Sequence, residues 1–428
     1  MKDILELDVE RAIAGGRMLA RHEGRIVFLA GAIPGERVRA RVTRAGRQGI
    51  WADTVDVIRV SPDRREPPCD PACGGLAFAH IRYDRQLALK GQILADAFHR
   101  LARTDIGTPI VQGSPEAGYR LRARLHVRDG GVGFFREGTH VLCDAGATRQ
   151  LSAAAMSAVE AAVRALRSRV ADCDTIVVSE NVAATERVLH LEARPGTRLD
   201  DLGAAAAALV TRQEANVSGV TALARGGLAT LAGSAHVTDS GSDLLGVEAT
   251  AYASARWIRR PTSFFQGNRF LTGPLVRRVL DLAPGERIAD LYAGVGLFTV
   301  ALAARGSRVI AVEGDSSSTE DLEANARPWT SLVRVVRGAV EEFLRRPPSP
   351  APDVVVVDPP RTGMSADALD HLSAWGMPVV VYVSCDPPTL ARDAARLAER
   401  GLRLLSLEGF DLFPNTPHVE AIATFARP

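Results

Sequence analysis

Two side chains near the end of the chain have types that suit covalent catalysis. The first, Cys385, follows the apolar run VVVYVS and comes directly before DPPTLARD, where Asp386 and two prolines are typical of a helix start. A thiol at the N-terminus of a helix lies at the positive end of the helix dipole, which lowers the pKa of a thiol from about 8.5. Cys385 is therefore a candidate nucleophile. The alternative is an inert buried cysteine at a strand end.

The second side chain is Glu420, in the segment FPNTPHVEAIATF. One reaction that needs both a thiolate and a base is methylation of uracil at carbon 5. That carbon is too weak a nucleophile to take a methyl group from a sulfonium unaided, and addition of a thiolate at C6 creates an enolate that can do so. A base must then remove the C5 proton before the thiolate leaves. Glu420 is the candidate base, although it also fits a carboxylate at a strand edge. We expect the neighbouring His418 to be structural.

A glycine-rich turn, DLYAGVGLFT, predicts a ligand site between a strand and a helix. Gly294 and Gly296 allow the backbone to approach a ligand closely, and the N-terminus of the helix adds a positive end. Thr299 stands where a dinucleotide site would have a third glycine, which disfavours a diphosphate ligand. Glu313 ends the strand RVIAVE, twenty-three residues after Asp290, where a carboxylate can accept hydrogen bonds from ribose hydroxyls. A ligand with a ribose is therefore expected.

The strand VVVVD ends in Asp358, followed by Pro359, Pro360 and Arg361. Two prolines keep the backbone extended at the carboxyl edge of a sheet, where ligands bind in open α/β folds. The alternative is a rigid loop with a capping aspartate. Methyltransferases that act on amino groups tend to carry an aromatic residue after these prolines, so arginine disfavours an exocyclic nitrogen as the target.

The elements that must position these residues form a repeated pattern of apolar strand, turn and helix from about residue 266 to the end of the chain. Strands this apolar are buried on both faces, as in a parallel sheet covered by helices. The pattern is shown by RIADLYAGVG, RVIAVEGD, LVRVVRG, DVVVVDPP and PVVVYVSC. Residues 266–428 are therefore expected to form a doubly wound α/β domain.

The preceding part of the chain predicts two further domains. Residues 1–62 contain short alternating segments between glycine and proline turns, which is typical of a small β-barrel, and Arg37, Arg39 and Arg41 share one strand face. That basic stripe indicates either a nucleic-acid surface or a solvated strand face. Residues 63–265 are expected to be a mixed α+β region, with a helix at YDRQLALKGQILADAFHRLA, a hairpin turning at Gly130 and Gly131, and an Ala-rich helix over 150–168.

The composition bounds the class of protein. The 428 residues suggest two or three domains, and 46% apolar with 24% charged residues indicates a folded globular protein. The acidic start MKDILELDVE does not fit a signal peptide, and no apolar run is long enough for a membrane helix, so we expect a cytoplasmic protein without membrane contact. Five cysteines are too few for a secreted disulfide framework, so we expect reduced thiols and a chemical or metal-binding role for any special cysteine.

The chain resembles the TRAM-domain RNA uracil-5 methyltransferases, which act on ribosomal RNA or on the T-loop of tRNA. The resemblance covers essentially the whole chain. The segments that carry it are GERVRARV, CGG near residue 73, SFFQGN, DLYAGVGLFT, VEGD, DPPRTG, VSCDPPTLARD and DLFPNTPHVE. The last two together are highly specific.

The resemblance implies a multidomain fold: an OB-like TRAM barrel, a middle α+β region and a Rossmann-like class I methyltransferase domain. It makes Cys385 the nucleophile and Glu420 the proton acceptor. The expected S-adenosylmethionine positions are Gln266, Tyr292, Gly294, Gly296, Glu313 and Asp358. Two positions depart from the family pattern, because Leu297 stands where relatives often have Asn and Ala339 where an acidic residue usually meets the adenine. Both departures predict weaker cofactor binding.

Many relatives hold a 4Fe–4S cluster with four cysteines. Here Cys69 and Cys73 remain, whereas Leu76 replaces the third ligand and Thr148 stands where the fourth is expected. Cys143 and His80 lie near in the sequence, but two thiolates with such substitutes make a poor cluster site. We therefore predict a remnant without metal.

The predicted function is methylation of uridine C5 in RNA with S-adenosylmethionine as cofactor. The barrel and the remnant cysteine run favour 23S rRNA as substrate, with the T-loop uridine of tRNA as the alternative. A cytosine-5 RNA methyltransferase would also need a thiolate, and a non-catalytic RNA-binding homologue would explain the lost cluster ligands and Ala339. We expect the target nucleotide to be flipped out of its stack, and the protein to be a monomer.

Overall fold

The computed structural model describes residues 4–212, 216–224, 227–246 and 250–427. Their contacts divide the chain into two units. Unit 1 consists of residues 1–113, 385–395 and 407–421, and unit 2 of residues 114–384, 396–406 and 422–428. Within the described residues, no helix is both long and apolar enough to cross a membrane.

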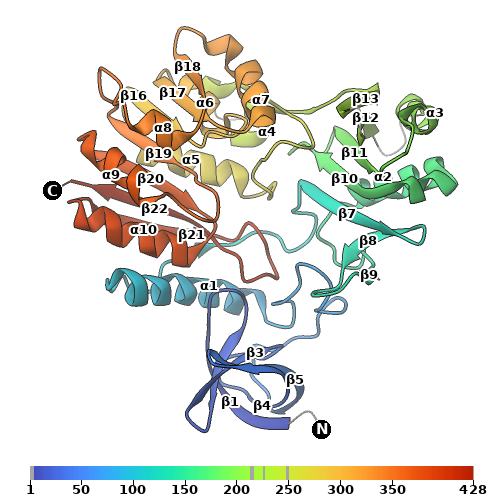
Figure 1. Cartoon of the computed structure of the whole chain (residues 1–428), viewed down its shortest axis with the longest axis vertical. Helices are drawn as coiled ribbons and strands as arrows, with labels where there is room; N and C mark the ends of the chain where they lie inside the picture. The colour runs from blue at the N-terminus through green and yellow to red at the C-terminus, as the bar shows by residue number, and fades with distance from the viewer. Residues whose placement is uncertain (1–3, 213–215, 225–226, 247–249, 428) are drawn as a thin grey trace. The chain divides into compact units, whose positions relative to one another are not determined.

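Unit 1 begins with a closed barrel of strand order β1-β2-β3-β5-β4 (Figure 1). Its strands are β1 (Ile4–Ala12), β2 (Met18–His22), β3 (Arg25–Ala30), β4 (Arg37–Gly46) and β5 (Gly49–Arg59). Alternate residues of β4 point inward, where Val38 and Ala40 are fully buried. The predicted barrel is therefore confirmed, although the short strand β2 was not anticipated, because its sequence lies between two glycine turns.

The outward face of β4 carries Arg37, Arg39 and Arg41, as the alternation predicted. Arg37 contacts Glu6 at 3.2 Å, and Arg39 forms an ion pair with Asp56. Acidic side chains of the neighbouring strands therefore neutralise two of the three arginines, so the stripe is less basic than its sequence suggested.

The rest of unit 1 is built around α1 (Tyr83–Ala97), continued by the π-helical turn η1 (Phe98–Ala102) and followed by the short strand β6 (Val111–Gln112). Leu89 and Ile93 of α1 join Phe78 and Ile81 in the hydrophobic core of the barrel. Leu87 of the same helix is only partly buried. One face of the predicted helix thus packs against the barrel.

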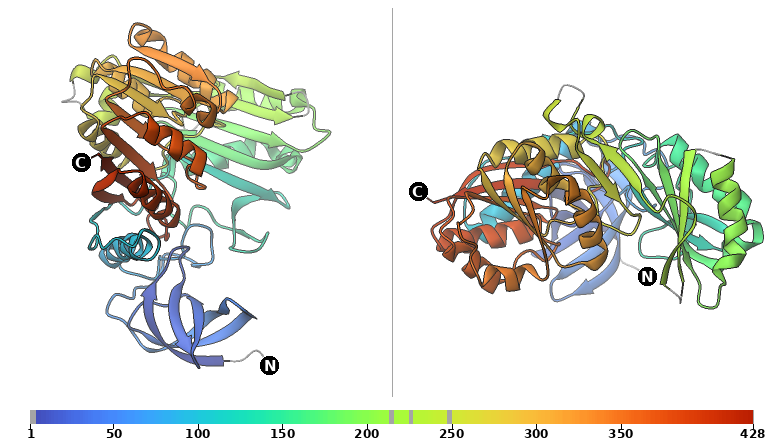
Figure 2. Two further views of the ribbon diagram at one scale, coloured as in Figure 1. Left: turned by 60° about the vertical axis from the view of Figure 1, so that its left-hand side comes forward. Right: turned by 90° about the horizontal axis from the view of Figure 1, so that it is seen from above.

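Unit 2 contains a seven-stranded sheet of order β13-β12-β11-β10-β7-β8-β9, on which α2 and α3 pack (Figure 2). The strands are β7 (Arg122–Arg128), β8 (Gly131–Phe135), β9 (Leu142–Cys143), β10 (Cys173–Glu180), β11 (Arg187–Ala193), β12 (Val217–Ala224) and β13 (Gly227–Gly233), and the helices are α2 (Ala153–Leu166), η2 (Arg167–Asp172) and α3 (Leu199–Thr211). The β7–β8 hairpin turns at Asp129 and Gly130, both with positive φ, one residue earlier than predicted.

The third sheet has the strand order β18-β17-β16-β19-β20-β22-β21-β6, and its strands from β18 to β20 pair in parallel. The strands are β16 (Arg287–Leu291), β17 (Arg308–Glu313), β18 (Val333–Arg337), β19 (Val354–Val357), β20 (Val379–Ser384), β21 (Arg403–Phe410) and β22 (Glu420–Ala426). All four residues of β19 are buried, as expected for a strand covered on both faces. The predicted doubly wound α/β architecture is confirmed.

Helices lie on both sides of the parallel strands (Figure 1). They are α5 (Thr272–Leu282), α6 (Leu297–Ala304), α7 (Ser316–Ala326), η5 (Arg327–Trp329), α8 (Val340–Leu344), α9 (Ala366–Ala374) and α10 (Pro387–Glu399). A small two-stranded sheet precedes them, made of β14 (Val237–Ser240) and β15 (Arg256–Arg259), with α4 (Gly241–Leu245) and η4 (Thr250–Tyr252) between its strands.

Candidate active site

The turn after β16 has a conformation that requires its glycines. Tyr292, Gly294 and Gly296 all have positive φ, of 61°, 58° and 88°. A Cβ at Gly296 would lie 2.8 Å from Cδ1 of Leu322, whereas a Cβ at Gly294 would meet nothing within 4 Å. Gly296 is therefore needed for packing, and the space beside Gly294 is open to a ligand.

Trp257 of β15 holds this turn through hydrogen bonds to its backbone. Its buried indole Nε1 donates to the carbonyl oxygens of Gly296 and Leu297, each at 3.2 Å. Those carbonyls belong to the first turn of α6, so the tryptophan fixes the start of that helix. Trp257 was not predicted as a site residue, because a tryptophan in a short strand gives no signal for the distant residue that it contacts.

Glu313 lies at the end of β17, beside the same turn. Its Oε2 accepts a hydrogen bond from the Gly294 amide at 2.8 Å, and its Oε1 accepts from the Asp315 amide at 2.7 Å. Each carboxylate oxygen accepts through about two lone pairs, so each keeps one for a further donor. The geometry suits a carboxylate that accepts hydrogen bonds from two neighbouring hydroxyl groups.

Two carboxyl groups lie side by side at the ends of β16 and β19. Thr299 Oγ1 donates to Oδ2 of Asp290, and Gln266 Nε2 donates to Oδ2 of Asp358 at 3.3 Å. Burial raises the pKa of Asp290 to about 7. Burial and the nearby charge of Asp290 also raise the pKa of Asp358, despite the Gln266 hydrogen bond. A cation placed here would favour the ionised form of both groups.

A small cavity of about 40 Å³ opens beside these groups. Gln266, Tyr292, Gly294, Leu297 and Asp358 are among the residues that line it. It has room for a few water molecules or for the end of a ligand, but not for a whole nucleoside. Four of the six predicted cofactor residues therefore share one cavity. A fifth, Glu313, is bonded to the turn that forms its wall.

The sixth predicted cofactor residue is Gly296. Gly296 does not line the cavity, but its conformation shapes the turn. Leu297, one of the two departures from the family pattern, lines the cavity with an apolar side chain. Ala339, the other departure, is an exposed residue that precedes α8. Phe264 and Phe298 also line the cavity and were not anticipated.

Cys385 lies in unit 1, directly after the last residue of β20 and two residues before the start of α10. It is half-buried. Oδ1 of Asp386 accepts a hydrogen bond from the Thr389 amide at 2.9 Å, which is the cap that the sequence predicted for this helix. The thiol is therefore placed at the N-terminus of α10.

Glu420, also in unit 1, is the first residue of β22 and is buried. The loop before it is held by α1. Lys90 forms a buried ion pair with Asp411. Oε1 of Gln86 accepts a hydrogen bond from the Asn415 amide at 2.9 Å, and Nε2 of Gln86 donates to Oδ1 of Asn415 at 3.0 Å. Asn415 has a φ of 66°, so the loop has a defined and unusual backbone. Glu420 is not the surface carboxylate of the alternative interpretation.

Cys73 of the remnant cysteine motif and Cys143 are disulfide-bonded, so the expectation of reduced thiols is wrong for these two residues. The positions of the two missing ligands are occupied by residues in ordinary packing. Leu76 is buried, and the buried Thr148 hydroxyl donates to the Ala145 carbonyl at 2.6 Å. The buried ring of His80 contacts the Ala32 carbonyl, and burial lowers the pKa of His80 to about 4. Among the described residues, no group of three or more His, Cys, Asp or Glu is placed to hold a metal ion. The leucine and threonine do not fit a four-thiolate cluster, and its absence stays a prediction.

Two family models match the chain. The model described as tRNA (Uracil-5-)-methyltransferase matches residues 349–427, and the TRAM domain model matches residues 3–49. The second match falls on the strands β1 to β4 of the barrel. The first falls on the part of the chain that contains Asp358, Cys385 and Glu420.

Relatives named 23S rRNA (uracil(1939)-C(5))-methyltransferase RlmD match over nearly their full length. The chain is 33% identical to the protein of Alkalilimnicola ehrlichii over 98% of this chain and 96% of the relative. It is also 33% identical to that of Thiobacillus denitrificans over 99% of both chains.

Among solved structures, the tRNA (uracil-54, C5)-methyltransferase of Pyrococcus abyssi, in complex with S-adenosyl-L-homocysteine, has a similar fold. The TM-score is 0.76, with 24% identity, over 98% of this chain and 99% of that chain. At this identity the likeness concerns the fold.

Proposed function

Because the chain belongs to the RNA uracil-5 methyltransferase family, we propose that it transfers the methyl group of S-adenosylmethionine to C5 of a uridine in 23S rRNA. The observation that carries the proposal is the relationship, at 33% identity and over nearly the full length, to enzymes named for that reaction. The open space beside Gly294 and the carboxylate of Glu313 support a ribose-containing cofactor.

The cofactor would be held by the residues of the turn and cavity in unit 2. Glu313 accepts hydrogen bonds from the ribose hydroxyls with its remaining lone pairs, and the turn at Gly294 lets the nucleoside approach the backbone closely. Asp358 and Gln266 lie beside the cavity for the charged end of the ligand. S-adenosylmethionine supplies a methyl group on a positively charged sulfur.

Cys385 is proposed as the nucleophile. Its sulfur adds to C6 of the uridine, which moves the electron pair of the C5–C6 double bond to C5 for attack on the methyl group. Its position at the N-terminus of α10 favours the thiolate that this addition requires. A thiol far from a helix start, such as the buried Cys173, has instead its pKa raised to about 11 by burial.

Glu420 is proposed as the base. It removes the C5 proton, the electrons of that bond restore the C5–C6 double bond, and the thiolate of Cys385 leaves C6. A base that acts on one particular hydrogen must be held in place, and the loop before Glu420 is anchored to α1 by Lys90 and Gln86. The Cys385 thiolate is thereby regenerated, and the methylated uridine is released as product.

We propose that residues 1–62 and 63–265 hold the RNA, and that residues 266–428 carry out methyl transfer. In the barrel, the Arg44 guanidinium lies 4.1 Å from the ring centre of Trp51, a pairing suited to nucleotide bases. In the middle region, the rings of His126 and Phe135 are stacked 3.8 Å apart, close to Arg128. The uridine would leave its stack to reach Cys385.

The nucleophile is tested with RNA that carries 5-fluorouridine, which cannot lose its C5 substituent as a proton. We expect a denaturant-stable covalent complex with the natural protein and none with Cys385→Ala. Cys173→Ala is the matched control, because that cysteine is buried in the middle region, and it should still form the complex. A complex formed by Cys385→Ala would refute the assignment.

The base is tested with ordinary uridine. In the Glu420→Gln variant, Cys385 should still add to C6, but the C5 proton should not be removed. The methylated adduct should therefore accumulate, and turnover should fall by at least a hundredfold. The control Glu399→Gln changes an exposed carboxylate at the end of α10 and should leave turnover unchanged. Normal turnover by Glu420→Gln would remove this residue from the mechanism.

The related proteins differ in the RNA substrate for which they are named. The full-length relatives favour 23S rRNA, whereas the matching family model and the solved structure are named for tRNA. Nucleoside mass spectrometry of rRNA and tRNA from a strain lacking the protein decides between them, and it also separates 5-methyluridine from 5-methylcytidine. Loss of 5-methyluridine from tRNA alone would overturn the rRNA assignment.

We further propose that the protein acts as a cytoplasmic monomer without an iron–sulfur cluster. The substitution of two of the four thiolates by Leu76 and Thr148 supports the last point. Stoichiometric iron and sulfide in anaerobically purified protein would contradict it. Light scattering of the purified protein measures the oligomeric state.

A further inference from the structure

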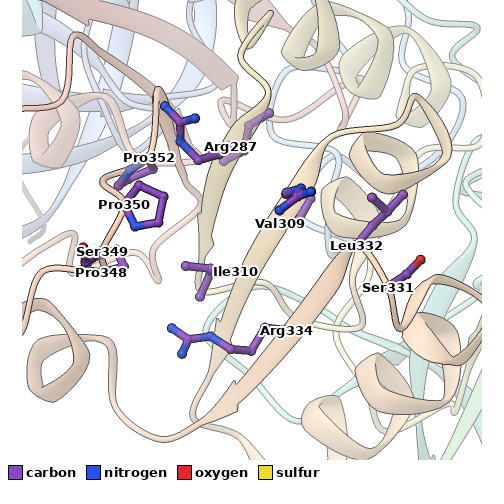
Figure 3. Close-up of a pocket in the computed structure, with 12 residues that line it drawn as sticks. Arg287, Val309, Ile310, Ser331, Leu332, Arg334, Pro348, Ser349, Pro350 and Pro352 are labelled. Atoms are coloured by element: carbon purple, nitrogen blue, oxygen red, sulfur yellow. The ribbon is translucent and has the colours of Figure 1, made fainter.

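A second and larger cavity lies at the opposite end of the parallel strands from the glycine-rich turn (Figure 3). Its volume is about 410 Å³, within the range of small-molecule sites. Arg287 and Arg308 are the first residues of β16 and β17, whereas Glu313 ends β17. Because five strand residues span about 16 Å, this cavity is separate from the cofactor site beside Glu313.

Three arginines of this cavity extend from one face of the sheet. Arg287 is the register partner of Arg308, and Ile310 is the partner of Arg334. Side chains alternate along a strand, so Arg308 and Ile310 share a face, and their partners on β16 and β18 share it too. Figure 3 shows Arg287 and Arg334 reaching from the sheet toward the proline-rich loop, with Ile310 between them.

The charge of this cavity is only partly balanced. Arg287 donates to Asp353 at 2.5 Å and to the Ala351 carbonyl at 3.2 Å, which fixes its position. Within the part of the chain that the structure describes, the side chains of Arg308 and Arg334 make no ion pair and no hydrogen bond. Both are exposed, and no acidic residue lines the cavity. The guanidinium groups of Arg308 and Arg334 are therefore available to bind an anion.

The opposite wall is apolar and stiff. It is formed by the loop after α8, with Pro348, Pro350 and Pro352 lining the cavity. Proline rings restrict the backbone, so this wall keeps its shape without a ligand. Ser349 and Ile310 also line the cavity. A flat base can pack on prolines while guanidinium groups bind a phosphate.

We propose that this cavity binds a phosphate-bearing nucleotide unit, with Arg308 and Arg334 on the phosphate and the base against the prolines. The unit belongs either to the RNA chain, at a distance from the methylated uridine, or to a free nucleotide. The first source rests on the proposed function, whereas the second does not. Binding is measured without methyl transfer, so it is independent of Cys385 and Glu420.

The test uses the full chain and the double variant Arg308→Ala/Arg334→Ala. The control, Arg327→Ala/Arg403→Ala, removes two exposed arginines outside the cavity. The dissociation constant for a 23S rRNA fragment is measured at several salt concentrations, and AMP and inorganic phosphate are titrated by calorimetry. S-adenosylmethionine binding checks that both variants remain folded.

If the unit belongs to the RNA, the cavity variant should bind RNA more weakly, and the slope of log affinity against log salt should fall by roughly 0.7 to 1.8, one or two phosphate contacts. If it is a free nucleotide, AMP should bind the natural protein and the control but not the cavity variant, with an unchanged RNA slope. Equal RNA slopes, together with equal or absent AMP and phosphate binding in all three proteins, would overturn the proposal.

Discussion

The ion pair between Lys90 and Asp411 offers a sharp test of how the loop before Glu420 is held. Both side chains are fully buried, and Lys90 Nζ also donates to the Phe413 carbonyl at 3.2 Å. Burial lowers the pKa of Lys90 and raises that of Asp411, and the attraction between them opposes both shifts. Lys90→Met keeps the length of the side chain but leaves the carboxyl without its cation.

Removing one partner of a buried pair costs about 3–5 kcal/mol, because an uncompensated charge remains in the interior. Asp411 can avoid that charge by taking up a proton, so its pKa in the folded variant should lie far above the unfolded value of about 3.9. The folded variant then binds more protons than the unfolded chain between these values, and its stability falls as the pH rises. The loss of unfolding free energy caused by Lys90→Met should therefore be smaller at pH 5 than at pH 8.

The assay is denaturant unfolding at both pH values, with Lys90→Met/Asp411→Asn as the matched control. The double variant removes both charges, so it should recover roughly half of the loss at pH 8. If the double variant is no more stable than Lys90→Met at pH 8, the charge argument is wrong. A loosened loop should also slow proton removal by Glu420, so Lys90→Met should accumulate covalent adduct on ordinary uridine RNA, which general destabilisation would not produce.

Three further predictions concern the cofactor cavity. Affinity for S-adenosylmethionine should rise with pH between about 6 and 8, because the raised pKa of Asp358 means that a proton must leave when the cation binds, and Asp358→Asn should flatten this dependence in calorimetry. Trp257→Phe should weaken cofactor binding several-fold without unfolding, since it removes only the donor to Gly296 and Leu297; unchanged calorimetric affinity would contradict this. Gly296→Ala should cost roughly 1–3 kcal/mol in unfolding measurements, from positive φ and the close Leu322; a cost below 0.5 kcal/mol would contradict it.

Local pattern was enough for the parts of the fold whose signal is contained in a short segment. Four valines in β19 predict a strand buried on both faces, and the alternation in β4 predicts which arginines point outward. The cap at Asp386 is likewise a property of adjacent residues. Hydrophobic periodicity and capping act over a few residues, so they can be read without knowing the fold.

The sequence patterns failed where the partner is distant in the chain. The stripe on β4 looked basic until Glu6 and Asp56 were placed beside it. The strand β2, of five residues between turns, had too little pattern to recognise. The hairpin shifted by one residue because pairing across β7 and β8, rather than the two adjacent glycines, sets the turn.

The sequence by itself determined the chemistry that the chain can offer: a thiol before a helix, a carboxylate near the last strand, and a glycine turn with Glu313 beyond it. Only the tertiary structure decided how these groups are held. Strand order brings β16 beside β19, and so Asp290 near Asp358; burial, together with the charge of Asp290, raises the pKa of Asp358. Lys90 meets Asp411 across 321 residues of sequence. Such contacts depend on the packing of the whole chain, which no local pattern specifies.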